Sequence, residues 1–300
     1  MIRYSLYQLS IKSRRTAGIT EGVFMKKLAL FGAGGKMGMR LGANLAKTDE
    51  FETMHVEVSE AGQAAVREAY GIDCVDVDIA LDGADIIVLA VPDTVIGKVA
   101  HGIIDKVKSG AVIFVLDGAA PFAGHLPERA DITYFMSHPC HPPIWNNENT
   151  TEERRDYFGG ISADQGIVNV LIQGPEEHYE VGNSVGKAIY APVVRSHRVT
   201  LKQFALLEPG LSETVNGSLM KVLRMAMDEV VKKGVSYDCA RDFLLGHMNI
   251  MGAVMFDQHQ GVFSDAANKA IEFGIPVLMK DDWLRCFDDD EIAASVNRIT

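Results

Sequence analysis

A short apolar run that leads straight into a glycine-rich turn constrains this chain more than any other stretch. Residues 27–31 have the length and composition of a strand, and Gly32-Ala33-Gly34-Gly35-Lys36-Met37-Gly38 follows at once. The next residues carry Leu41 and Leu45 at helical spacing. A strand, a glycine turn and a helix in this order are typical of the first βαβ unit of a nucleotide-binding domain.

The glycines of this turn have separate expected functions. Gly32 permits the tight turn, Gly34 or Gly35 lets backbone N–H groups approach a pyrophosphate, and Gly38 lets the helix lie close to the strand. A turn that binds no phosphate is the alternative. The predicted cofactor-binding residues here are Gly32, Gly34, Gly35, Lys36, Met37 and Gly38.

An acid at the end of the second predicted strand, residues 54–58, strengthens this interpretation. Glu57 lies 19 residues after Gly38, close to the offset of about 20 residues at which a carboxylate meets the adenosine ribose. A carboxylate there accepts both ribose hydroxyls and repels a 2′-phosphate, which favours NAD over NADP. Glu60 takes this role if the strand runs longer, and a solvated acid at a strand end is the plainer alternative.

Buried strands continue to alternate with helices, which predicts an α/β fold with a doubly wound sheet of six or seven strands. The run 85–91 is apolar throughout and ends in Pro92-Asp93, at the carboxyl edge where such sheets bind ligands. Pro92 and Asp93 are therefore further cofactor-binding candidates. The strand at 111–116 again ends in an acid, Asp117, and we expect 168–172 to be the last strand.

Beyond residue 173 the apolar period changes from that of strands to that of helices, which predicts an all-α second half. We therefore divide the chain into an extension (1–24), an NAD-binding domain of the Rossmann type (25–173) and a helical domain for substrate binding and dimerisation (174–300). Within the helical half, Glu208 falls on an apolar stripe, and Pro209-Gly210 should make that helix kink or restart.

Composition limits the class of protein. The net charge of −11 argues against nucleic acids and anionic membranes as partners, and no apolar run reaches the length of a membrane span. Four scattered cysteines without a CxxC pair suit a reducing cytoplasm. Residues 1–24 are basic, and a basic leader can be a transit peptide. The alternative, which we favour, is that the sequence begins at an upstream start codon and that Met25 opens the protein.

His138 is the first candidate for chemistry, because it follows the predicted strand 132–136 at the same sheet edge as the glycine turn. A histidine there can accept the proton of a hydroxyl group while hydride leaves, or can bind a metal ion. A loop histidine bonded only to backbone is the structural alternative. Cys140 and His141 would complete a zinc-like set, although three ligands within four residues rarely point at one ion.

Glu208 is the second candidate, because a carboxylate on an apolar stripe is costly unless it is paired or bound to a cation. If the stripe faces the carboxyl edge of the sheet, Glu208 would bring a hard oxygen ligand to the substrate. An acid that caps a restarted helix is the alternative. We predict His138 and Glu208 as the catalytic pair and as ligands of a divalent metal, zinc or similar.

Four segments carry a family resemblance: the glycine turn, Val91-Pro92-Asp93, the His138-Pro139 turn and the helical second half. Together they resemble the 6-phosphogluconate and β-hydroxyacid dehydrogenase superfamily. The stretches 137–143, 206–214 and 263–274 are more specifically similar to its oxidoisomerase family, and only the leader departs from the match.

The oxidoisomerase resemblance implies NAD-dependent oxidation of D-apionate, a branched sugar acid, with rearrangement to 3-oxoisoapionate. Oxidation of the hydroxyl beside the carboxylate gives a keto acid next to a tertiary alcohol, and a divalent cation that chelates both oxygens lowers the barrier to migration of a carbon substituent. A simple hydroxyacid or prephenate-like dehydrogenase without a metal, and an NAD-sensing protein without turnover, are the alternatives. Long apolar stripes in the helical half predict a homodimer, and whether a partner residue such as His247 joins the site stays open.

Overall fold

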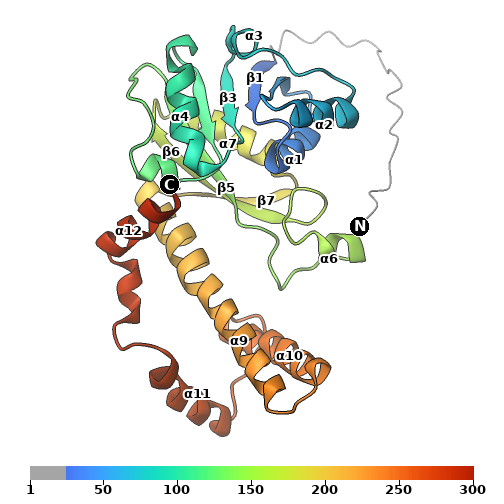
Figure 1. The fold of residues 1–300 in the computed structure, drawn as a ribbon, viewed down its shortest axis with the longest axis vertical. Coiled ribbons are helices and arrows are strands. Elements are labelled where there is room, and N and C mark those ends of the chain that lie inside the picture. The colour runs from blue at the N-terminus through green and yellow to red at the C-terminus, as the bar shows by residue number, and fades with distance from the viewer. Residues whose placement is uncertain (1–24) are drawn as a thin grey trace.

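A seven-stranded sheet forms the body of the computed structural model, which describes residues 25–300 (Figure 1). Our predictions for the extension, residues 1–24, lie outside the described residues. The strand order is β2-β1-β3-β4-β5-β6-β7. The strands are β1 (Lys26–Phe31), β2 (Phe51–Val56), β3 (Ile86–Leu89), β4 (Val112–Val115), β5 (Thr133–Pro139), β6 (Gln165–Gln173) and β7 (Val193–Arg198).

Helices cover both faces of this sheet, because its central strands are apolar on both sides. In β1, Leu28 and Leu30 point to one face while Ala29 and Phe31 point to the other, and all four are buried. The first face packs against α1 (Lys36–Leu45), α2 (Glu60–Tyr70) and α7 (His178–Ile189). The second packs against α3 (Val77–Leu81), α4 (Asp93–Ile103), α5 (Ala119–Phe122) and α8 (Leu201–Ala205).

The sheet order reverses at β1, where the chain passes from β2 on one side to β3 on the other. Strands β1 to β5 are mutually parallel, so their carboxyl ends, and the turns that follow them, lie at one edge. This arrangement confirms the predicted Rossmann-type doubly wound sheet. A ligand crevice is expected at such a reversal point.

The end of the sheet differs from the prediction. The strand expected to be last is β6, which pairs antiparallel with β5, and β7 then pairs parallel with β6. β7 lies beyond residue 173, within the half that we expected to be all helix. Its sequence Val-Val-Arg-Ser-His-Arg carries mostly polar and exposed side chains, as an edge strand does, so no apolar run marks it.

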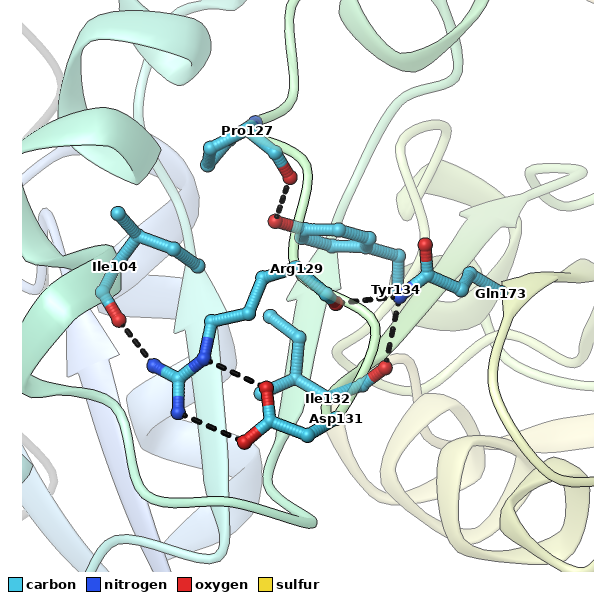
Figure 2. Close-up of polar contacts among 7 residues, drawn as sticks. All are labelled: Ile104, Pro127, Arg129, Asp131, Ile132, Tyr134 and Gln173. Carbon is cyan, nitrogen blue, oxygen red and sulfur yellow. Dashed lines mark hydrogen bonds and ion pairs between the residues drawn. The ribbon is translucent and has the colours of Figure 1, made fainter.

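A set of hydrogen bonds fixes the chain just before β5, the strand that carries His138 (Figure 2). Arg129 pairs with Asp131 and donates to the carbonyl of Ile104. Ile104 is the first residue of the short helix η1 (Ile104–Lys106), which directly follows α4. The buried Tyr134 hydroxyl donates to the Pro127 carbonyl at 2.6 Å, and burial raises its pKa to about 12. The side chain of Gln173 in β6 donates to the carbonyls of Arg129 and Ile132.

After β7, one continuous helix is made of α8, η2 (Leu206–Gly217) and α9 (Ser218–Lys232). η2 is π-helical and contains Pro209. The helix therefore continues past the proline instead of restarting, because the wider turn accommodates the missing N–H. η2 carries Glu208 toward the sheet, while α9 runs outward.

The helix α9 and the two helices that follow it, α10 (Tyr237–Met255) and α11 (Asp265–Leu278), form an arm that projects away from the sheet (Figure 1). α10 packs against α9. The helices η3 (Trp283–Phe287) and α12 (Asp289–Ile299) then return to contact η2. Within residues 25–300, we find no helix with the length and apolar character that crossing a membrane requires. The short helix α6 (Thr151–Arg155) lies in the loop between β5 and β6.

Candidate active site

The glycine turn after β1 is built from backbone contacts that leave no room for side chains. Gly32 has a φ of 72°, in the left-handed region that favours glycine. A Cβ on Gly34 would lie 2.3 Å from the Cα of Gly62 in α2, and a Cβ on Gly38 would lie 2.0 Å from the Gly32 carbonyl oxygen. Gly35 is the N-cap of α1, with Lys36 and Met37 in its first turn. The N-terminus of α1 therefore approaches the sheet edge closely enough to receive a pyrophosphate.

Glu57 follows β2 and reaches this turn. Its Oε2 accepts a hydrogen bond from the Gly34 amide at 3.0 Å, and its Oε1 accepts one from the Ser59 amide at 2.9 Å. Burial alone would raise the pKa of the Glu57 carboxyl, but the hydrogen bonds from Ser59 and Gly34 outweigh burial and lower the pKa. Glu57 is thus an anion beside the turn, where a ribose diol would lie. Glu60 instead begins α2.

A cavity of about 400 Å³ opens at the carboxyl edge, beside the point where the strand order reverses. It brings together three parts of the chain that the sequence suggested separately: the start of α1, the turn after β3, and the end of β5. The lining side chains among the predicted residues are Gly35, Lys36, Met37, Pro92, Asp93 and His138. Asp117, Phe158 and Tyr190 also line it, and we did not predict them as site residues. His141 lines it too, and the sequence suggested it only as part of a zinc-like set.

His138 is held with one ring nitrogen directed at two carboxylates. Its Nδ1 lies 2.9 Å from the Pro139 carbonyl oxygen, which can only accept, so Nδ1 carries the proton in the neutral ring. Nε2 is then the unprotonated nitrogen. It lies 3.7 Å from Oδ2 of Asp117 and 3.9 Å from Oε1 of Glu208. The structure therefore brings His138 and Glu208 together, from β5 and η2, with side chains only 18% and 25% exposed.

Two further acids near this imidazole, Asp93 and Glu213, have raised pKa values. Burial, and then the charge of Asp117, raise the pKa of Asp93 to about 6. Burial, and then the charges of Glu208 and Asp117, raise the pKa of Glu213. A partly buried group of carboxylates of this kind attracts protons or a cation.

The loop between β5 and β6 closes one side of the cavity through Phe158. The Arg40 guanidinium lies 4.5 Å from the centre of the Phe158 ring, and the Lys36 ammonium lies 5.1 Å from it. Arg40 also donates to the Gly159 carbonyl at 2.7 Å. The ring of His141 packs on Phe158, and its Nδ1 lies 2.8 Å from the Phe158 carbonyl oxygen.

His141 combines this position with an unusual backbone. Its φ is 62°, which is uncommon for a residue other than glycine and is typical of functional sites. Its ring stands edge-on to that of His138 at 6.0 Å. The zinc-like set of His138, Cys140 and His141, which the close spacing disfavoured, does not form among the described residues. More generally, residues 25–300 contain no group of three His, Cys, Asp or Glu side chains close enough to enclose a metal ion by themselves.

His247, the residue considered for a contribution by a partner subunit, does not approach this cavity in its own chain. It lies on α10 in the arm, and its ring stacks on Phe243 with ring centres 4.1 Å apart.

Comparisons with known proteins agree with the fold. A family model described as phosphogluconate dehydrogenase (decarboxylating) C-term matches residues 146–300. The D-apionate oxidoisomerase of Rhizobium rhizogenes is 60% identical over 92% of this chain and 100% of its own length. That of Cupriavidus necator is 58% identical over 92% of this chain and 99% of its own length.

A solved structure is also closely similar. It is the crystal structure of a semialdehyde dehydrogenase NAD-binding protein from Cupriavidus necator in complex with calcium and NAD. It is 57% identical, covers 92% of this chain and 100% of its own, and superposes with a TM-score of 0.91. On the strength of the curated relatives, this chain belongs to the D-apionate oxidoisomerase family and is an oxidoreductase.

Proposed function

We propose that this protein is an NAD-dependent oxidoisomerase that converts D-apionate to 3-oxoisoapionate. The observation that carries the proposal is the convergence of His138 Nε2 with the Glu208 carboxylate at 3.9 Å, beside the cavity that the glycine turn borders. This pair unites the half of the chain suited to a dinucleotide with the half that the sequence assigns to the substrate. A small branched sugar acid fits the scale of a cavity of about 400 Å³.

NAD is the proposed cofactor because of Glu57. Its ionised carboxylate lies at the glycine turn, bonded to the Gly34 amide at 3.0 Å. Such a group accepts hydrogen bonds from a ribose diol and repels a 2′-phosphate. The pyrophosphate would lie at the N-terminus of α1, and the nicotinamide would then extend past Pro92 and Asp93 toward His138.

The first chemical step is oxidation of the secondary hydroxyl beside the substrate carboxylate. Hydride passes from that carbon to the nicotinamide, and the hydroxyl proton passes to Nε2 of His138, whose Nδ1 proton is held by the Pro139 carbonyl. The product of this step is a keto acid beside a tertiary alcohol. The tertiary hydroxyl then loses its proton and its carbon becomes a ketone, while a carbon substituent leaves that carbon and bonds to the neighbouring keto carbon. The former keto oxygen takes up a proton, so the isomerisation is complete without further oxidation.

A divalent cation is part of the proposal, because the carboxylates fit one chemically. Asp117 and Glu208 each lie within 4 Å of His138 Nε2, and burial followed by the charge of Asp117 raises the pKa of the neighbouring Asp93. His138, through Nε2, and Glu208 would hold the ion, and acceptance of the hydroxyl proton by Nε2 is the competing role of His138 in the absence of an ion. When bound, the ion would supply Lewis acidity for the developing alkoxide.

The test is NADH production from D-apionate and NAD, measured by absorbance, beside a panel of unbranched 2-hydroxy acids. We expect turnover with D-apionate and loss of at least about 100-fold in kcat for His138→Asn, because general base catalysis contributes about that much. His101→Asn, on the exposed side of α4, is the matched control and should retain activity. Removal of divalent ions by a chelator should abolish the second step.

Each alternative has its own outcome in this assay. Turnover of unbranched acids with no preference for D-apionate identifies a simple hydroxyacid dehydrogenase. NAD binding without turnover of any acid identifies a sensing protein.

We also propose the cytoplasm as the compartment, because the cysteines Cys74, Cys140, Cys239 and Cys286 are free thiols in the structure.

A further inference from the structure

His141 lines the cavity and keeps one ring nitrogen free to accept a hydrogen bond. Its Nδ1 lies 2.8 Å from the Phe158 carbonyl oxygen, which can only accept, so Nδ1 carries the proton in the neutral ring. Nε2 is then an acceptor, and within residues 25–300 no donor forms a hydrogen bond to it. The mechanism proposed above gives this nitrogen no function.

The two histidines of the cavity are held in the same way. Nδ1 of His138 faces the Pro139 carbonyl at 2.9 Å, just as Nδ1 of His141 faces the Phe158 carbonyl. The ring centres lie 6.0 Å apart and the ring planes are nearly perpendicular, at 87°. One cavity therefore contains two imidazoles with fixed tautomers and unprotonated Nε2 atoms, although hydride transfer needs only one.

The backbone at His141 indicates that this side chain is used. Among the described residues other than glycine, only His141 and Asp257 have a positive φ, which is 62° at His141. Pro142 follows, and a residue before proline prefers an extended backbone. Glycine would adopt this φ without strain, as Gly159 and Gly160 do in the same loop. A strained residue kept where glycine would be relaxed points to a function of its side chain.

The proposed substrate carries more hydroxyl groups than oxidation requires. The hydroxyl beside the carboxylate is assigned to His138, while the branched carbon bears a tertiary hydroxyl and two hydroxymethyl groups. Hydroxyl groups on neighbouring carbons are close enough for one to reach each ring at the usual distance of about 2.8 Å. Lys36 and Arg40 offer donors only, and both cations lie over the Phe158 ring.

We propose that His141 is a specificity-determining residue whose Nε2 accepts a hydrogen bond from a hydroxyl group at the branched carbon of D-apionate. This inference rests on the proposed function, because it assigns the second imidazole to the part of the substrate that an unbranched acid lacks. Phe158 holds the ring through its carbonyl and through ring contact at 4.9 Å. The loop between β5 and β6 thus recognises the branch, while β5 supplies the residue for the oxidised carbon.

The test compares D-apionate with 2-hydroxyisovalerate, which has the same carbon skeleton but a hydrogen in place of each hydroxyl of the branch. His141→Asn tolerates a positive φ but is too short to place an acceptor at the position of Nε2. We expect its kcat/KM for D-apionate to fall at least about 10-fold, because a hydrogen bond to the substrate is lost. The inhibition constant of 2-hydroxyisovalerate and the affinity for NAD should stay the same.

Two further variants complete the comparison. His141→Gln can place its amide oxygen near the position of Nε2, so it should recover most of the lost kcat/KM. His101→Asn, on the exposed side of α4, is the control and should change none of these values.

A kcat/KM for D-apionate that His141→Asn leaves unchanged would overturn the inference alone. Equal weakening of both acids would also overturn it, because His141 would then only hold the loop. Absence of D-apionate turnover in the unchanged protein would instead remove the proposed function, and this inference with it. If the variants fail to fold, a crystal structure with NADH and D-apionate decides: a branch oxygen within about 3.2 Å of His141 Nε2 supports the inference, and any other partner overturns it.

Discussion

Replacement of Asp93 by asparagine should stabilise the metal-free protein above pH 6. Burial and the neighbouring Asp117 raise the pKa of Asp93 to about 6, from an ordinary value of 3.8. The folded state therefore binds more protons than the unfolded state between these two values, and stability falls as pH rises through that window. Above it, the folded protein carries an ionised carboxylate that its surroundings disfavour.

The magnitude follows from the shift. A difference of about 2 pKa units corresponds to about 3 kcal/mol at most. Water that reaches the partly exposed carboxylate screens the repulsion, so we expect about 1 kcal/mol. Asp93→Asn removes this term, so its stability relative to the unchanged protein should increase by about 1 kcal/mol between pH 4 and pH 7.

The assay is urea unfolding at several pH values in the presence of a chelator. Asp281→Asn, a substitution of an exposed acid in the loop before η3, is the control and should change the free energy of unfolding by less than about 0.5 kcal/mol at every pH. A difference between Asp93→Asn and the unchanged protein that stays constant from pH 4 to pH 7 would refute the reasoning. Excess Ca²⁺ should reduce or reverse the advantage of Asp93→Asn, because a bound cation favours the ionised acids.

Three further substitutions test the glycine turn, the Glu57 carboxylate beside it and the hydrogen bonds that fix the chain before β5. Gly38→Ala should destabilise the fold by at least about 2 kcal/mol in urea unfolding, because the new Cβ would lie 2.0 Å from the Gly32 carbonyl oxygen. Gly102→Ala is the control and should be neutral or slightly stabilising, because the space around Gly102 is open. Glu57→Ala should weaken NAD binding about 10-fold to 100-fold in a fluorescence titration, because hydrogen bonds to a charged group contribute about 1.5–3 kcal/mol. The same substitution should reduce discrimination against NADP. An unchanged affinity for NAD would assign Glu57 a purely structural role. Tyr134→Phe leaves the Pro127 carbonyl without its hydroxyl donor and should cost about 1–2 kcal/mol of stability. We expect kcat to stay unchanged, because this hydrogen bond lies at the opposite end of β5 from His138. A large loss of kcat would contradict this separation.

The dinucleotide half was predictable because its signals are local and periodic. Glycines that only fit one tight turn, and apolar runs buried on both faces, stand next to one another in the sequence. The same alternation places His138 at the carboxyl edge. The helical stripe drew attention to Glu208, although its members Leu211 and Val222 are exposed in the structure. The approach of His138 and Glu208 to 3.9 Å follows from α8, which packs on the sheet through Phe204 and continues into η2.

The rest of the site depends on tertiary contacts that leave no periodic signal. Asp117 follows a buried strand just as Asp93 does, and that shared pattern was a signal for it. His141 and Phe158 belong to an irregular loop whose shape depends on contacts with Arg40 in α1, far away in sequence. β7 was missed because an exposed edge strand carries polar side chains on both faces.

The carbon skeleton of the product tests the central claim most directly. Carbon-13 NMR of the reaction of labelled D-apionate with NAD should identify rearranged 3-oxoisoapionate, formed in equal amount to NADH, with Glu208→Gln leaving the keto acid unrearranged or blocking turnover. A product that keeps the original branched skeleton in the unchanged protein would contradict the claim that His138 and Glu208 form an oxidoisomerase site.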